Sequence, residues 1–138
     1  PPPPPPPLFF YIQIRASEIP LRLVGSEMCI RDSHPIYQEM VRQQRWDVIP
    51  GAESNETFSD RCLGALDRIV KRHPGELVLC GVHGGVIGAV LARIANSRPF
   101  AFGGSDNCSI SQIVFADGEW IIRRFNDSSH LYQQLHHG

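Results

Sequence analysis

Hydrophobic and polar residues follow a helical period in the middle of the chain. Between positions 57 and 72 the apolar residues recur every three or four positions, which predicts an amphipathic helix with one buried stripe. The stripe consists of Phe58, Cys62, Leu66, Ile69 and Val70. Thr57 and Asp60 have the spacing of a capping box, so we expect the helix to begin at Thr57. Pro74 and Gly75 then predict its end.

A strand and a second helix are predicted next. Residues 77–82 are almost wholly apolar, which favours a strand covered on both faces, as in a parallel sheet. Gly84 and Gly85 turn the chain, and a second helical pattern follows. Its expected buried stripe is Val86, Ile87, Val90, Leu91 and Ile94. Residues 57–96 are therefore predicted to form helix, strand and helix.

Two strands are predicted near the C-terminus. Residues 110–115 and 120–125 flank Asp117-Gly118, a dipeptide that is a strong signal for a two-residue hairpin turn. We expect this antiparallel hairpin to lie at the edge of an otherwise parallel sheet. Earlier in the chain, residues 34–48 predict a short helix that runs into a loop, and Pro50-Gly51 predicts a turn.

Residues 1–33 have a different character. Seven prolines open the segment and favour an extended polyproline helix, and no regular period follows them. The stretch GSEMCIRDS at 25–33 resembles translated adapter-like read-through at the ends of proteins inferred from sequencing assemblies. We therefore expect residues 1–33 to be a disordered, non-native segment, 34–131 to be the folded part and 132–138 to be a flexible tail. The alternative for the first segment is a proline-rich ligand for an aromatic groove.

Composition narrows the function classes. The 138 residues suit one domain, with 42% hydrophobic and 20% charged residues. The formal net charge of −1 gives no reason to expect a nucleic acid or an acidic membrane surface as a partner. No apolar run approaches the ~18 residues that span a bilayer. The four cysteines form no C-x-x-C pair, and buried free thiols at Cys62 and Cys80 favour a reducing compartment, so we expect a cytoplasmic protein.

His83 is the first candidate for chemistry. It stands between the predicted buried strand and the N-terminus of the second helix, at the edge where open α/β sheets bind ligands. The helix N-terminus favours an anion, and Gly84 and Gly85 allow an oxygen-rich ligand close to the backbone. An imidazole there can donate a hydrogen bond to a phosphoryl oxygen or add positive charge when protonated. The alternative is a structural histidine that caps the turn.

Several other chemistries lack their motifs. The stretch GVHGG resembles the G-x-S-x-G nucleophile elbow, but His83 takes the serine position, which rules out serine-type acyl transfer from it. Neither a G-x-G-x-x-G fingerprint nor a G-x-x-x-x-G-K loop is present. The spacing of His83, His130 and Cys80 fits no set of metal ligands, so we expect no metal and no cofactor.

Four features of residues 51–131 resemble, in chain order, the C-terminal half of the histidine phosphatase superfamily, the phosphoglycerate mutase-like proteins. PGAES at 50–54 resembles the loop before a helix, and Arg61 follows within that helix. LVLCGVHGG at 77–85 resembles the strand that carries the second active-site histidine. NCSISQIVF and WIIRRFNDSSHL resemble the closing hairpin and tail.

The resemblance implies a fold and an activity. It implies an α/β fold whose mostly parallel sheet has helices on both faces and a C-terminal antiparallel hairpin. It implies hydrolysis or transfer of a phosphoryl group from a small phosphomonoester through a phosphohistidine. His83 would be the second histidine, which stabilises the charge on the transferring group. The expected substrate-binding residues are His83, Gly84, Gly85, Glu53, Ser54 and Asn107.

The sequence also departs from the family. It contains no Arg-His-Gly, the motif of the nucleophilic histidine, and the family's second arginine and its acid motif are missing as well. We expect an incomplete sheet whose N-terminal strands are missing, in a truncated gene where residues 1–33 replace the lost half. The parent would be a phosphatase or mutase, and this fragment would be inactive. The alternative is a non-catalytic phosphate-binding or regulatory module. For either function the sequence leaves the oligomeric state open.

Some candidate residues keep a second interpretation. Glu53 and Ser54 are expected either to lie at the mouth of a phosphate site or to cap the loop that contains them. Arg61 suits an exposed or salt-bridged helix face better than the site. Asn107 suits a turn as well as a hydrogen bond near the site. His130 is expected to be structural, and Trp46 is expected to be a core or edge residue.

Overall fold

The computed structural model describes residues 10–11 and 34–133. The predictions of a non-native segment at 1–33 and of a tail at 132–138 fall almost entirely outside these residues. The elements are, in order, β1 (Phe10–Tyr11), α2 (Pro35–Gln43), the 3₁₀ turn η1 (Trp46–Val48), α3 (Asn55–Arg72), β2 (Val78–Leu79), α4 (Gly84–Ala95), β3 (Ile110–Ala116), β4 (Glu119–Asp127) and α5 (Ser129–Gln133).

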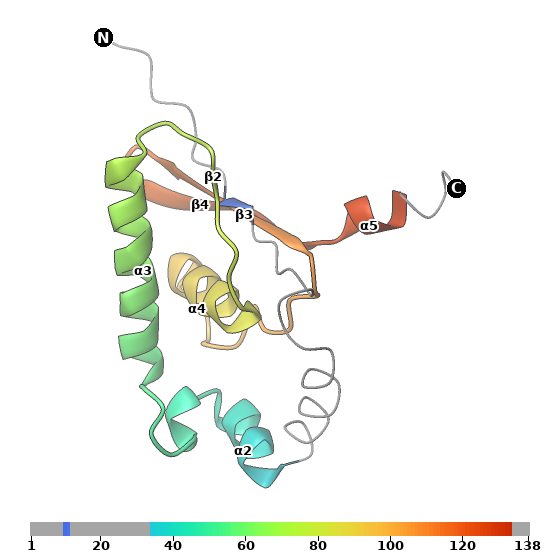
Figure 1. The fold of residues 1–138 in the computed structure, drawn as a ribbon. Helices are drawn as coiled ribbons and strands as arrows, with labels where there is room; N and C mark the ends of the chain where they lie inside the picture. Colours follow the sequence, from blue (N-terminus) through green and yellow to red (C-terminus); the bar gives the residue numbers. More distant parts are fainter. Residues whose placement is uncertain (1–9, 12–33, 134–138) are drawn as a thin grey trace.

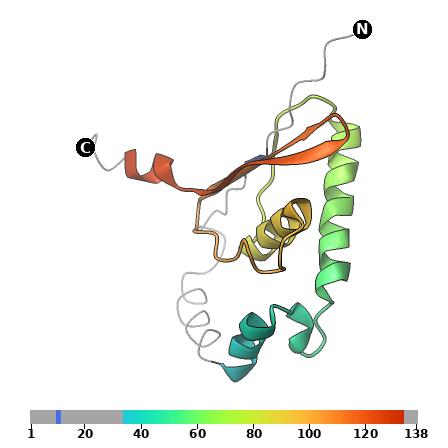
Figure 2. The same cartoon turned by 180° about the vertical axis from the view of Figure 1, so that it is seen from behind.

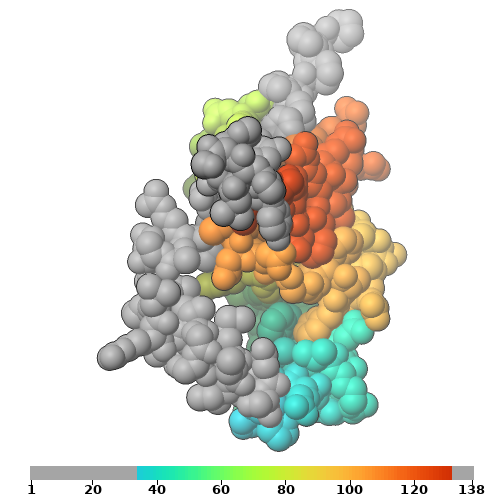
Figure 3. Space-filling view, turned by 90° about the vertical axis from the view of Figure 1, so that its right-hand side faces the viewer, coloured from blue at the N-terminus to red at the C-terminus, as the bar shows by residue number. Residues whose placement is uncertain are grey.

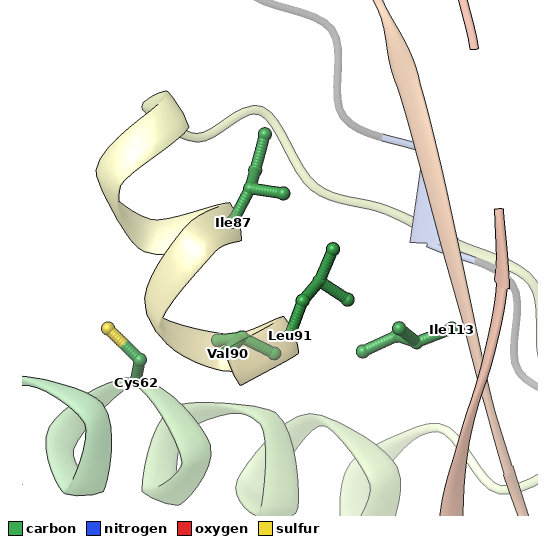
Figure 4. Close-up of a cluster of buried hydrophobic side chains, with 5 residues drawn as sticks. All are labelled: Cys62, Ile87, Val90, Leu91 and Ile113. Atoms are coloured by element: carbon green, nitrogen blue, oxygen red, sulfur yellow. The ribbon is translucent and has the colours of Figure 1, made fainter. Parts of the chain in front are cut away.

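The hydrophobic core lies between α3, α4 and the β3–β4 hairpin. It is built around Cys62, Ile87, Val90, Leu91 and Ile113. Figure 4 shows Cys62 of α3 directed toward α4, and Ile113 of β3 reaching toward Leu91. Leu91 is only 2% exposed, the most completely buried large side chain of the described chain. The predicted stripe of the second helix is thus confirmed, with Val86 and Ile94 packed at the border of the core.

The architecture is mixed α/β, but the expected mostly parallel sheet is not formed in the described part of the chain. β3 and β4 pair antiparallel, and the parallel pairing is limited to Phe10 with Val78 and Tyr11 with Leu79. The expectation of helices on both faces is also wrong for the described elements, because α3 and α4 lie on the same side of the hairpin (Figures 1 and 2).

The segment around β2 is covered on one face only. Val78, Cys80 and Val82 pack against the core, whereas Leu77 and Leu79 are 58% and 60% exposed. The prediction of a strand buried on both faces is therefore wrong. Successive side chains of a strand point to opposite faces, and the helices supply cover on only one of them.

The predicted hairpin is confirmed. β3 and β4 pair from Ala116 opposite Glu119 outward, and Asp117 and Gly118 form the two-residue connection. Both turn residues have positive φ, 52° and 78°, as a type I′ turn requires. Aspartate tolerates this backbone better than most residues and glycine adopts it freely, so the dipeptide determines the turn.

The long helix α3 begins earlier than predicted. Ser54 is its N-cap, and the Ser54 side chain accepts a hydrogen bond from the Thr57 N–H at 3.1 Å. The predicted start at Thr57 is wrong because Ser54, three residues earlier, already provides the capping oxygen. The helix ends at Arg72, just before the expected Pro74-Gly75 stop. In α2, which confirms the predicted short helix, the His34 Nδ1 accepts from the Ile36 N–H at 3.2 Å.

Arg93 links α4 to α3 through side-chain hydrogen bonds. Arg93 of α4 donates to the Ser59 Oγ at 2.8 Å and to the Asp60 Oδ1 at 2.6 Å, both on α3. The segment between α4 and β3 returns over the surface, and Figure 3 shows it in orange between the red hairpin and the cyan α2. Among the described helices, none is both long and apolar enough to span a bilayer.

Candidate functional site

His83 stands at the N-terminus of α4 with its side chain exposed. It is the N-cap residue, and its carbonyl accepts hydrogen bonds from the N–H groups of Val86 at 3.0 Å and Ile87 at 3.3 Å. The imidazole makes no capping hydrogen bond, so at this N-cap only the backbone carbonyl of His83 bonds to the first turn of the helix. The ring is therefore available to a ligand.

The imidazole lines a hollow of about 600 Å³ formed by the loop before α3, the first turns of α3 and the start of α4. We call this space the His83 hollow. It is lined by Trp46, Gly51, Ala52, Glu53, Phe58, Arg61, Cys62, His83, Gly85 and Val86. The fold thus brings His83 together with Glu53 and Arg61, which lie far from it in the sequence.

The two glycines that follow His83 are the first residues of α4. Their N–H groups precede the first intrahelical bond, and within the described part of the chain they donate to no other residue. Together with the helix dipole they make this end of α4 electropositive. Gly85 lines the hollow, whereas Gly84 faces Ser105, whose Cβ would be 3.7 Å from a Cβ at position 84.

Glu53 and Arg61 form an ion pair inside the hollow. The Arg61 Nη2 bonds to Glu53 Oε1, and Nε lies 3.4 Å from Oε2. The hydrogen bonds to Glu53 raise the pKa of Arg61 further above its usual value. The guanidinium also lies 5.4 Å from the centre of the Phe58 ring. Arg61 is salt-bridged and exposed, as expected, and in addition it lines the hollow.

Two aromatic side chains form a wall of the hollow. Trp46 and Phe58 meet edge to face with their ring centres 6.1 Å apart. The Trp46 ring lies against Gly85, where a Cβ would be 3.4 Å from two ring carbons. Asn55 fixes this loop, because its Oδ1 accepts from the Trp46 N–H at 2.9 Å and its Nδ2 donates to the Gln44 carbonyl at 2.6 Å. The sequence pattern indicated only a core or edge position for Trp46.

The remaining sequence candidates lie elsewhere. Ser54 caps α3 and does not line the hollow. Asn107 is exposed in the turn before β3, and His130 is half-buried in α5; neither lines the hollow. Of the six expected substrate-binding residues, the structure therefore gathers His83, Gly85 and Glu53 in one hollow, whereas Gly84 lines another cavity.

Cys62 contributes a buried free thiol to the hollow. Burial raises its pKa, and burial likewise raises the pKa of Cys80. Since the thiolate and not the thiol is the nucleophile, these groups are poor nucleophiles at neutral pH. Within the described residues no three His, Cys, Asp or Glu side chains converge as metal ligands.

Comparisons with known proteins agree on one family. Residues 25–128 match the model of the "Histidine phosphatase superfamily (branch 1)". The chain is 36% identical over 89 residues to the metal-independent phosphoserine phosphatase of Arabidopsis thaliana, covering 64% of this chain and 37% of that protein. It is 30% identical over 95 residues to the uncharacterized phosphatase PhoE of Bacillus subtilis strain 168, covering 68% and 49%.

A solved structure supports the same fold. YhfR of Bacillus stearothermophilus superposes with a TM-score of 0.60 at 24% identity, over 74% of this chain and 52% of that one. The chain spans less than half the length of the two curated relatives.

Proposed function

Because the chain belongs to the histidine phosphatase superfamily, branch 1, we propose that it forms the phosphoryl-holding half of a site that hydrolyses or transfers phosphomonoesters. The observation that supports this most directly is the exposed imidazole of His83 beside the electropositive end of α4, lining one hollow. The relatives in Arabidopsis thaliana and Bacillus subtilis are named as phosphatases, which supports the same reaction class.

His83 has an electrostatic role in this proposal. During transfer, negative charge is spread over the equatorial phosphoryl oxygens, and donors already in place stabilise it. His83 donates one hydrogen bond, and the amides of Gly84 and Gly85 supply fixed partial positive charge. No reorganisation of these groups is needed, because the imidazole is not engaged in capping.

The nucleophile is the part that this sequence does not provide. In the proposed reaction a histidine nitrogen attacks phosphorus, an N–P bond forms and the ester P–O bond breaks. The leaving alkoxide takes a proton from an acid, and water then hydrolyses the phosphohistidine. The sequence contains no Arg-His-Gly motif for the attacking histidine. We therefore expect this chain to bind a phosphoryl group without turnover.

The absence of an Arg-His-Gly motif from this sequence also favours a second function. A non-catalytic phosphate-binding or regulatory module would use His83 and the end of α4 for binding alone. The two functions differ when the chain is preceded by a strand ending in Arg-His-Gly. A phosphatase or mutase would then hydrolyse p-nitrophenyl phosphate and form an acid-labile phosphohistidine, whereas a binding module would still bind without turnover.

The binding proposal is tested by titrating inorganic phosphate into the chain and its variants by calorimetry. Loss of one hydrogen bond to a charged group costs about 1.5–3 kcal/mol, so His83→Ala, which leaves no side-chain donor, is expected to weaken binding by roughly tenfold or more. His130→Ala is the matched control, because His130 lies in α5 and outside the hollow. Equal affinity in wild type and His83→Ala overturns the assignment of His83. Rapid turnover of p-nitrophenyl phosphate by this chain overturns the assignment of the missing nucleophile.

A further inference from the structure

The His83 hollow combines one phosphate-binding end with walls that carry little free charge. Its apolar side chains are Trp46, Ala52, Phe58, Cys62 and Val86, and its charged side chains Glu53 and Arg61 neutralise each other. We propose, on the basis of the proposed function, that the hollow takes phosphomonoesters whose alcohol part is aromatic or otherwise apolar. It discriminates against esters that carry a carboxylate near the phosphate and no amino group, such as phosphoglycolate.

The aromatic wall is already in place before a ligand arrives. Trp46 is half-buried, held through Asn55 at its backbone and packed against Gly85 and Phe58. The Trp46 ring also lies 5.3 Å, centre to centre, from the Phe100 ring. A rigid aromatic surface of this kind loses little entropy on binding and gains from contact with a second ring. An aryl group extending from a phosphate at His83 would therefore meet a prepared surface.

The ion pair between Glu53 and Arg61 accounts for the discrimination against ligands with a carboxylate. Among the described residues that line the hollow, Arg61 is the only arginine or lysine, and its guanidinium is occupied by the Glu53 carboxylate. A second carboxylate from a ligand would have to displace Glu53 from Arg61, or else remain near Glu53 with no cation of its own. Both alternatives cost free energy, since like charges repel and the existing charge-assisted bonds are lost. An uncharged alcohol part avoids this cost.

Three probes test the proposal by calorimetry on the whole chain: inorganic phosphate, phenylphosphonate and phosphoglycolate, which carries a carboxylate and no amino group. Phenylphosphonate is expected to bind roughly tenfold more tightly than inorganic phosphate, since the ring adds aromatic contact and buried apolar area. Phosphoglycolate is expected to bind no more tightly than phosphate. If phosphate binds and phosphoglycolate binds as tightly as phenylphosphonate, the inference fails and the proposed function stands. If none of the three binds, both fail.

A substitution at the pair gives an independent measurement. Glu53→Gln removes the carboxylate and leaves the Arg61 guanidinium able to donate hydrogen bonds to a carboxylate of the ligand. The ratio of phosphoglycolate affinity to phenylphosphonate affinity is expected to rise roughly fivefold, the size of effect that a half-exposed ion pair allows. Glu119→Gln, in the hairpin and outside the hollow, is the matched control and should leave that ratio as in wild type. A ratio that stays constant or falls in Glu53→Gln overturns the role of the pair.

Discussion

Gly88 of α4 lies directly against the backbone of Phe102. A Cβ built at position 88 would be 3.1 Å from the Phe102 carbonyl oxygen, closer than an ordinary van der Waals contact. Phe102 in turn packs edge to face on Phe125 of β4, with ring centres 5.3 Å apart. The close approach at Gly88 therefore keeps the segment after α4 between the helix and the hairpin.

The first prediction concerns this contact. Gly88→Ala must displace a backbone oxygen, and overpacking of this kind costs about 1–3 kcal/mol, against a gain of about 0.5–1 kcal/mol in helix propensity. We expect the free energy of unfolding to fall by roughly 1 kcal/mol, measured by urea denaturation. Gly64→Ala in α3 is the matched control, because a Cβ there has its nearest neighbour at 3.6 Å, the flexible end of Arg68. That variant should be more stable than wild type; a stabilised Gly88→Ala would contradict the close approach.

The second prediction concerns the loop that positions Trp46. Asn55→Ala removes both hydrogen bonds that hold this loop, each worth about 0.5–1.5 kcal/mol. In a Trp120→Phe background, the remaining tryptophan fluorescence is expected to shift to longer wavelength as Trp46 becomes more hydrated. Glu56→Ala serves as the comparison, because Glu56 lies in the same first turn and its side chain makes no hydrogen bond to that loop within the described residues. Identical spectra for Asn55→Ala and its parent would show that the aromatic packing alone holds Trp46.

The third prediction concerns the link between α3 and α4. Arg93→Met removes the bonds to Ser59 and Asp60 and keeps much of the apolar stem. The ion pair with Asp60 is half-exposed, and the Ser59 Oγ still donates to the Glu56 carbonyl at 3.1 Å, so the cost should be only about 1 kcal/mol. Urea denaturation measures it, with Arg123→Met on the exposed face of β4 as control. Equal losses in the two variants would mean that the link adds nothing.

The fourth prediction concerns the pH dependence of Cys62. Burial raises the pKa of this thiol in the folded chain above its ordinary value of about 8.5. At about pH 8, iodoacetamide should therefore label Cys62 more slowly in the folded chain than in urea, as followed by peptide mass spectrometry. Above about pH 8.5 the unfolded chain releases a proton that the folded chain retains. The contribution of this thiol to the free energy of unfolding is present below that pH and is lost as the pH rises further. Equal labelling rates in the two states would contradict the burial.

The local structure was predictable wherever neighbouring residues decide it. The three- and four-residue spacing identified α3 and α4, and Asp117-Gly118 identified the hairpin, because both signals act within a few residues. His83 was found in the same way, from a strand pattern that changes to a helix pattern across two glycines. The start of α3 was misplaced because Ser54 and Thr57 both have the chemistry of an N-cap, and only the backbone conformation distinguishes them.

Only the tertiary structure decided which segments meet. The apolar sequence of residues 77–82 determined a preference for burial, but the arrangement of α3 and α4 on one side left Leu77 and Leu79 exposed. The sequence determined an imidazole at a helix N-terminus; the fold added the Trp46 wall and the Glu53–Arg61 pair beside it. Periodicity and turn chemistry are properties of neighbours along the chain. Contacts between distant segments depend on how all the elements pack together, and no local pattern encodes them.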